Sequence, residues 1–162
     1  MKYYLKYILQ KLIALLLLPF RLFPIKKNRI LFLSLEGGSS YEYSCNPRYF
    51  CEYLLRERPG KYEPIWLFKK PADYAFLREK GIETSRHFSL RGIYYALTSR
   101  IVISNGGYLT WFPFRKNQLC INTWHGSGAY KKLENDTEGA NGATKKRMIY
   151  AGRHTAAFLS GC

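Results

Sequence analysis

The stretch RILFLSL, residues 29–35, decides the fold. A near-continuous apolar run of this length is typical of a strand that is buried on both faces, as in a parallel sheet. A glycine-containing turn follows at residues 36–40. Asn46 and Pro47 then predict a helix, with Asn46 as its cap and Pro47 at its first helical position. A buried strand that leads into a helix is the first unit of a parallel α/β fold.

The same alternation of strand and helix continues along the chain. Apolar runs predict further strands at residues 64–68, 82–84, 100–104, 118–124 and 156–159. Capping and turn residues predict helices at residues 46–58, 71–81, 89–97, 129–133 and 143–150. The sequence therefore predicts a Rossmann-like parallel sheet with helices on both faces.

An amino-terminal helix is predicted within residues 3–23, which are rich in Leu, Ile and Tyr, and Pro19 ends or bends it. A helical wheel separates Lys2, Lys6 and Gln10 from the apolar residues Leu5, Ile8, Leu12, Leu15 and Leu16. The helix is thus expected to present one basic and polar side and one apolar side.

Three interpretations of this helix compete. A cleaved signal peptide has the right charge and length, but no small-residue cleavage site follows. The uninterrupted apolar run at residues 12–20 is shorter than the ~20 residues of a spanning helix. An interfacial helix on anionic membrane lipids, at the cytoplasmic face of the cell membrane, fits best. We therefore expect residues 1–27 to form a membrane-associated helix and linker, and residues 28–162 to form the α/β domain.

Charge and cysteine content limit the function classes. The chain of 162 residues carries a net charge of +15, and no acidic residue precedes Glu36, which indicates an anionic partner surface. No zinc-ligand spacing, RNA-binding aromatic motif or basic heptad region is present, so no nucleic-acid partner is expected. None of the four cysteines belongs to a C-x-x-C pair, so we expect reduced thiols in a cytosolic protein and no metal site.

His125 is the leading candidate for a catalytic residue. It lies just past the apolar run at residues 118–121, and open α/β sheets bind ligands beyond such strand ends. The ordinary pKa of histidine lies near neutrality, so its imidazole can accept a proton at cellular pH. No acidic residue occurs between Glu83 and Glu134, which favours an anionic substrate. The basic residues in this interval are Arg86, Arg91, Arg100, Arg115, Lys116, Lys131 and Lys132.

Glycine turns beside the predicted strand ends are candidates for phosphate contact. Gly106 and Gly107 follow one strand, and Gly126 follows His125. Glycine lets backbone N–H groups approach a phosphate closely, although each turn is also explained as a simple tight turn. Lys131 and Lys132 are the nearest cations in sequence, and a solvated helix face explains them equally well. None of the turns makes a dinucleotide-binding or Walker fingerprint.

Three segments resemble one known family. The run INTWHGSG, residues 121–128, followed by KKL at residues 131–133, looks like the W-H-G segment of the CDP-glycerol glycerophosphotransferases, the teichoic acid polymerases and primases of bacterial cell walls. The runs SRIVISNGG, residues 99–107, and NPRY, residues 46–49, resemble the same family. The resemblance covers roughly residues 28–162, and Ser127 stands where Thr is common.

The resemblance implies a GT-B-like enzyme with two Rossmann-like domains, of which this chain is the amino-terminal, acceptor-side part, truncated before the nucleotide-binding domain. His125 would act as the base on an acceptor hydroxyl, which attacks the β-phosphate of CDP-glycerol and expels CMP. The expected substrate-binding residues are Asn105, Gly106, Gly107, Trp124, Gly126, Ser127, Lys131 and Lys132. A CDP-polyol donor, a lipid-linked or polymeric acceptor and the membrane are the implied partners, with no cofactor and no metal. The chain alone is not expected to turn over.

Two other functions stay open on the sequence alone. A sugar transferase of the same architecture is one, since a fold does not fix the donor. The other is a membrane-bound domain that binds an anionic polymer without catalysis.

Overall fold

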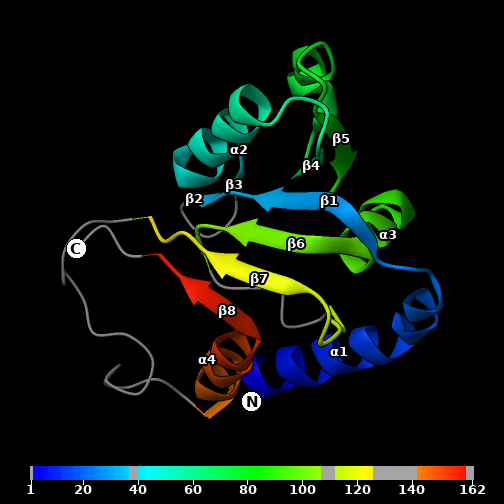
Figure 1. Cartoon of the computed structure of the whole chain (residues 1–162). Helices are drawn as coiled ribbons and strands as arrows, with labels where there is room; N and C mark the ends of the chain where they lie inside the picture. Colours follow the sequence, from blue (N-terminus) through cyan, green and yellow to red (C-terminus); the bar gives the residue numbers. More distant parts are fainter. Residues whose placement is uncertain (1, 37–39, 107–111, 126–141, 160–162) are drawn as a thin grey trace.

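A six-stranded sheet, in the order β5-β4-β1-β6-β7-β8, forms the centre of the molecule. The computed structural model describes residues 2–36, 40–106, 112–125 and 142–159 (Figure 1). All five strand pairings are parallel. The strands are β1 (Lys26–Leu33), β4 (Glu63–Phe68), β5 (Glu83–Arg86), β6 (Ser99–Ser104), β7 (Leu119–Asn122) and β8 (Thr155–Phe158). A short antiparallel pair, β2 (Leu35–Glu36) and β3 (Ser40–Tyr41), follows β1.

The inner strands are buried on both faces, as their apolar runs predict. Leu31 and Leu33 of β1 belong to a core cluster on one face, with Ile65 and Val102 from the strands on either side. Phe32, between them in the sequence, belongs to a second cluster on the other face, which contains Trp66. The rings of Phe32 and Trp66 stack with their centroids 5.5 Å apart. Successive side chains of a strand point to opposite faces, so a strand covered on both faces needs an unbroken apolar run.

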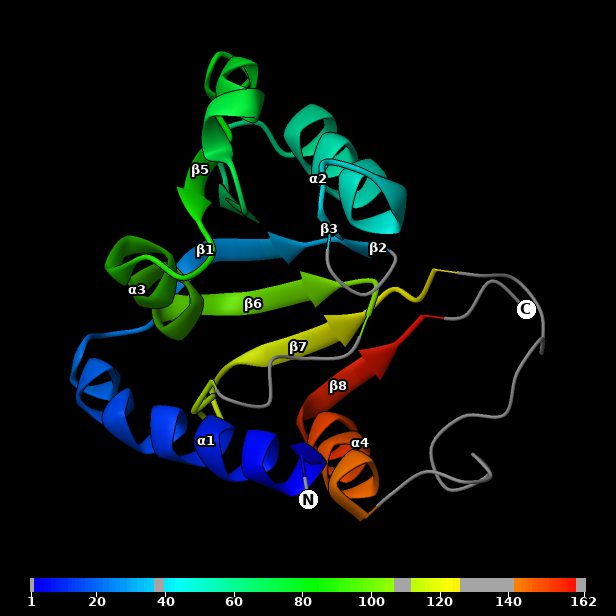
Figure 2. The ribbon, with the colours of Figure 1, turned by 180° about the vertical axis from the view of Figure 1, so that it is seen from behind.

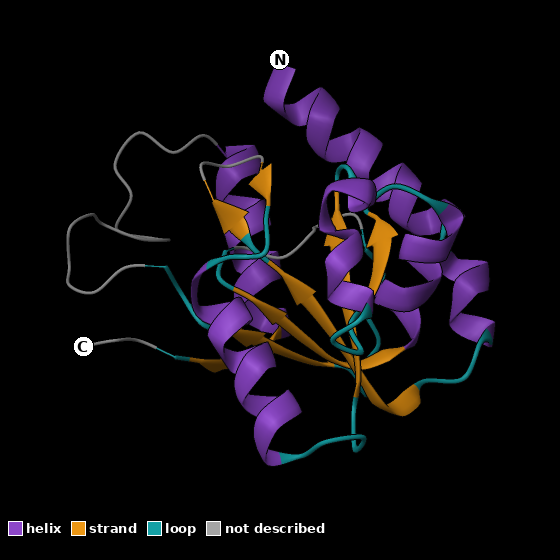
Figure 3. Cartoon of the chain, turned by 90° about the horizontal axis from the view of Figure 1, so that it is seen from above, coloured by secondary structure: helices purple, strands orange, loops and turns teal. Residues whose placement is uncertain are grey.

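Helices cover both faces of the sheet, as predicted, and Figures 2 and 3 show the two layers. The cluster around Phe32 includes residues from α2 (Cys45–Glu57) and the 3-10 helix η2 (Pro71–Arg78). The cluster around Leu31 includes residues from the other four helices. These are α1 (Lys2–Leu16), η1 (Leu18–Leu22), α3 (Leu90–Thr98) and α4 (Gly142–His154).

The main predicted strands and helices are present, but the structure differs in detail: the short pair β2 and β3 was not predicted, and two helices begin or run differently. Asn46 is not the cap of α2: Ser44 holds that position and Asn46 lies within the first turn. The segment that begins at Pro71 is a 3-10 helix and not an α-helix, and Tyr74 has non-helical dihedral angles that kink it. Pro47 also lies inside the first turn of α2, where its missing N–H has no intrahelical partner to lose. The predicted helix at residues 129–133 lies outside the described residues.

The amino-terminal helix α1 turns part of its apolar surface away from the protein. Ile13 packs against the core, as do Leu17 and Phe20 just beyond α1. Leu5, Leu12 and Leu16 remain exposed, at 67%, 52% and 76% of their full surface. α1 runs beside α4, as Figure 1 shows. None of the described helices has the length and hydropathy required to cross a membrane.

The order of the strands places a topological switch point between β1 and β6. From β1 the chain goes outward to β4 and β5, then crosses to β6 and continues outward to β7 and β8. The loops that leave β1 and β6 therefore diverge, and a crevice between such loops is where open α/β sheets bind ligands. In Figure 1 the arrowheads of β1, β6 and β7 point to this edge.

Candidate functional site

His125 lies beyond the end of β7, at the carboxyl edge of the sheet. Its Nδ1 is 2.6 Å from the backbone carbonyl oxygen of Asn105, which directly follows β6. A carbonyl oxygen only accepts, so Nδ1 carries the hydrogen and donates it. In the neutral ring Nε2 then holds a free lone pair. The side chain is exposed, so the geometry provides an oriented proton acceptor at the surface of this edge.

Asn105 links the two strands at the switch point. Its side-chain amide donates to Ser34 Oγ at 3.3 Å, and Ser34 directly follows β1. Both residues are fully buried. The next residue, Gly106, is also buried, and its N–H donates to Ser104 Oγ at 3.2 Å. In the described structure Asn105 thus holds His125 through its carbonyl, while its role in substrate binding stays a prediction.

Trp124 lies beside His125 in a strained backbone conformation. Its φ of 56° is in the left-handed region, which is uncommon for bulky residues. Its N–H donates to Asn122 Oδ1 at 2.9 Å. The indole ring lies 4.4 Å from the His125 ring and 5.5 Å from the ring of Phe158 on β8, measured between centroids. Strained residues of this kind gather at functional sites, where the surrounding contacts maintain them.

The remaining predicted site residues are not placed. Gly107, Gly126, Ser127, Lys131 and Lys132 lie outside the described residues. Their expected contacts with substrate stay predictions. Among the described residues, no group of three or more His, Cys, Asp or Glu side chains comes together as metal ligands do.

Asn46, which the sequence predicts as a helix cap, lies at the His125 turn. Its Nδ2 donates to two successive carbonyl oxygens, that of Thr123 at 2.8 Å and that of Trp124 at 3.0 Å. An Asn before a helix is normally interpreted as a cap, so no local pattern distinguishes this long-range contact. The only sequence signal was the family-like NPRY run in which Asn46 stands.

The other two histidines have structural surroundings, as predicted. His87 is buried, and its Nε2 lies 2.8 Å from the hydroxyl of Tyr41. Burial and, to a smaller degree, the nearby Lys69 lower the pKa of His87 to about 4. His154 closes α4, and its Nδ1 is 2.8 Å from the carbonyl oxygen of Tyr150 one turn earlier.

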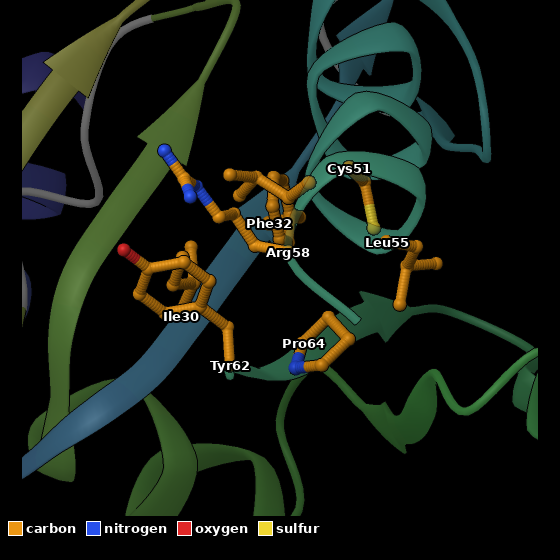
Figure 4. A pocket seen from close by; sticks show the side chains of 8 residues that line it. Ile30, Phe32, Cys51, Leu55, Arg58, Tyr62 and Pro64 are labelled. Atoms are coloured by element: carbon orange, nitrogen blue, oxygen red, sulfur yellow. The ribbon is translucent and has the colours of Figure 1, made fainter. Parts of the chain in front are cut away.

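Two hollows lie elsewhere on the described part of the chain. The first lies between α2 and the sheet and has a volume of about 10 Å³, room for no more than a water molecule. Its lining, which includes Ile30, Phe32, Cys51 and Pro64, is mainly apolar (Figure 4). The second is an open hollow of about 200 Å³ beyond the end of β4, lined by Tyr41, Glu42, Lys69, Lys70, Asp73 and Tyr74. Neither hollow is lined by His125.

Comparison with known proteins gives consistent matches. The chain matches the family described as CDP-Glycerol:Poly(glycerophosphate) glycerophosphotransferase over residues 15–161. It is 32% identical over 118 residues to a teichoic acid poly(glycerol phosphate) polymerase of Bacillus spizizenii, which covers 72% of this chain and 29% of that protein. The polymerase of the same description from Bacillus subtilis is 31% identical over 115 residues, 71% of this chain and 15% of that protein.

Solved structures share the fold. A variant of the wall teichoic acid polymerase TagF matches with a TM-score of 0.70 at 22% identity, over 98% of this chain and 40% of that chain. The same polymerase soaked with CDPG matches with a TM-score of 0.69 at 23% identity, over 97% and 41% of the two chains. The present chain thus spans less than a third of either curated relative and less than half of the solved structures.

Proposed function

The chain belongs to the CDP-glycerol:poly(glycerophosphate) glycerophosphotransferase family, and from this premise we propose that His125 is the base in glycerophosphate transfer from CDP-glycerol to an acceptor hydroxyl. Membership confirms the resemblance seen in the W-H-G segment, and with it the expectation of a transferase family. The whole enzyme's activity, donor and acceptor are proposals for this chain, because it spans 29% of one relative and 15% of another.

A single contact carries the proposal: the 2.6 Å hydrogen bond from His125 Nδ1 to the Asn105 carbonyl. It leaves Nε2 as the proton acceptor of the neutral ring. After Nε2 has taken a proton, both ring nitrogens carry hydrogen and the carbonyl still holds Nδ1–H. The ring therefore keeps its orientation through the reaction, as a general base requires.

The proposed step is a displacement at phosphorus. An alcohol is a weak nucleophile at neutral pH, so His125 Nε2 removes the hydroxyl proton as the oxygen attacks the β-phosphorus of CDP-glycerol. The new bond joins the acceptor oxygen to that phosphorus, and the bond from phosphorus to the bridging oxygen breaks. CMP leaves with the bonding electron pair, and the proton on His125 later passes to solvent. Base catalysis of this kind contributes about 10²- to 10⁴-fold.

The charge distribution supports anionic substrates. A nucleotide-activated polyol and a glycerol phosphate polymer both carry negative charge along their length. The net charge of +15, together with the acid-free interval between Glu83 and Glu134, favours their approach. The GT-B-like arrangement, with a nucleotide-binding domain opposite this one, belongs to the same proposal and is supported by the likeness to TagF over 40% of that chain.

Peripheral membrane association is also part of the proposal. The exposed leucines of α1 provide an apolar surface, and residues 1–35 contain no acidic side chain. Apolar residues beside a basic segment are typical of helices that lie in the interface of an anionic membrane. This surface would hold the His125 edge close to a lipid-linked acceptor at the cytoplasmic face.

The test uses the complete gene product that carries residues 1–162. It is incubated with CDP-glycerol and a lipid-linked glycerol phosphate acceptor, and CMP release and glycerophosphate incorporation are measured. His125→Gln should lower both rates about 10²- to 10⁴-fold. Turnover of a nucleotide sugar in place of CDP-glycerol would instead identify a sugar transferase. Polymer binding that His125→Gln leaves unchanged, without CMP release from the native protein, would identify a binding domain.

A further inference from the structure

We infer that Asn46 is a positioning residue for His125: its side-chain amide fixes the backbone turn that places the imidazole against Asn105. The catalytic meaning of this inference rests on the proposed function. The residues involved come from three separate elements: the start of α2 and the segments that follow β6 and β7. Figure 1 shows that α2 begins at the same edge of the sheet as these strand ends.

The side-chain amide of Asn46 donates two hydrogen bonds. Nδ2 lies 2.8 Å from the carbonyl oxygen of Thr123 and 3.0 Å from that of Trp124. A primary amide has two N–H groups, so one nitrogen can satisfy both carbonyls. These carbonyls belong to the two residues that directly precede His125.

The strained conformation of Trp124 explains why one amide can reach both carbonyls. In an extended strand, successive carbonyls point to opposite sides, whereas in a helical conformation of either hand they point to the same side. Trp124, at a φ of 56°, has the left-handed conformation. An extended Trp124 would not turn both carbonyls toward Asn46, so the two hydrogen bonds from the Asn46 amide stabilise the turn that Trp124 makes in the left-handed region.

The turn at Trp124 determines where the imidazole lies. His125 is the next residue, so the φ and ψ angles of Trp124 set the direction in which the chain leaves β7. The segment before the turn is held separately, because the Thr123 N–H donates to the Ser104 carbonyl at 2.8 Å. Loss of the Asn46 contacts would thus leave Thr123 in place and release the turn. The 2.6 Å bond from His125 to Asn105 lies beyond that turn and would loosen with it.

A structural role as a helix cap does not account for Asn46. Ser44 occupies the cap position of α2, and Asn46 lies within the first turn. Asn46 is also exposed, so its replacement creates no cavity in the core. A substitution at this position should therefore change the His125 turn without unfolding the domain.

The test follows the tautomer of His125 by ¹H–¹⁵N NMR of the imidazole nitrogens in the 162-residue chain. The chain has three histidines, so His87→Gln, His125→Gln and His154→Gln assign the signals. In the native chain, the neutral His125 ring should carry its hydrogen on Nδ1. Asn46→Ala removes both donors and should give a mixture in which Nε2–H is populated. Asn46→Ser retains one donor and should give an intermediate spectrum.

Tyr53→Ala is the matched control, because Tyr53 is an exposed residue of the same helix whose described ring contact is with Arg56. It should leave the His125 tautomer unchanged. A native Nδ1–H tautomer in Asn46→Ala, or the same loss in Tyr53→Ala, would overturn the inference. Circular dichroism of each variant checks that the domain is folded.

Activity gives a separate readout that distinguishes this inference from the proposed function. In the complete gene product, Asn46→Ala should lower kcat about 10- to 100-fold with little change in the KM for the donor, and Asn46→Ser should restore part of the rate. If the His125 tautomer changes in Asn46→Ala but the native protein does not transfer glycerophosphate, the proposed function is refuted and the positioning role is retained. Transfer by the native protein with an unchanged tautomer in Asn46→Ala would refute the positioning role and retain the function.

Discussion

The guanidinium of Arg29 binds the carboxylate of Glu63 through two hydrogen bonds, Nε to Oε2 at 3.1 Å and Nη2 to Oε1 at 2.8 Å. Arg29 is 2% exposed and also donates from Nη1 to Thr98 Oγ1 at 2.6 Å. This network joins the amino-terminal half of β1 and the first residue of β4 to the end of α3, away from the carboxyl edge of the sheet where His125 lies. It should therefore affect stability and leave the site unchanged.

Glu63→Gln should lower the free energy of unfolding by about 2 to 4 kcal/mol, because it leaves the buried guanidinium of Arg29 without its charged partner. Urea denaturation measures this loss. Glu57→Gln removes one partner of an exposed ion pair with Arg56 and should cost less than about 1 kcal/mol. Equal losses in the two variants would contradict the prediction that the buried Arg29–Glu63 pair stabilises the domain more than the exposed pair. A change in the His125 imidazole signals of Glu63→Gln would contradict the prediction that this network leaves the site unchanged.

Acid should destabilise the domain through His87. The pKa of His87 is lowered from 6.5 to about 4, chiefly by burial, so between these values the unfolded chain binds a proton that the folded chain does not. Above pH 6.5 the His87 ring is neutral in both states and does not lower the free energy of unfolding. As the pH falls toward 4, the free energy of unfolding decreases by up to about 3 kcal/mol. His87→Gln should flatten this part of the stability profile measured by urea denaturation. His154→Gln leaves His87 in place and should keep the slope.

Arg115 should determine how firmly η1 is attached to α3 and to the loop that precedes β7. Its Nη1 donates to the carbonyls of Arg21 at 2.7 Å and Phe23 at 2.9 Å, and its Nη2 donates to that of Leu97 at 2.6 Å. Arg115→Ala removes all three bonds and should lower stability by about 2 kcal/mol. Faster hydrogen exchange of the Phe20 and Phe23 amides in η1 and its cap would show the release. Lys116→Ala, at the exposed neighbouring position, should leave both amides protected.

The sequence was a sufficient guide to the fold because the inner strands are covered on both faces. Such strands are short apolar runs between turn residues, as at Leu31 and Val102, and this pattern is local. The position of His125 beyond a strand end was predictable for the same reason. The role of Asn46 was not, because its partners lie 77 and 78 residues away and a local cap explains the same sequence. The tautomer of His125 likewise depends on the carbonyl of Asn105, which follows another strand and lies 20 residues earlier.

The exposed face of α1 should bind anionic vesicles. Leu5, Leu9, Leu12 and Leu16 recur on one stripe of the helix and are all exposed. Leu12→Gln combined with Leu16→Gln preserves the charge and the helix but removes two apolar side chains from the proposed lipid contact. Each partly inserted leucine contributes about 1 kcal/mol, so the vesicle partition coefficient should fall at least about tenfold in a sedimentation assay. The paired control, Phe88→Gln with Leu90→Gln, replaces two exposed apolar side chains away from α1 and should keep full binding. Equal losses in the two double variants would refute α1 as the contact surface, and so would undiminished binding of the Leu12 and Leu16 variant.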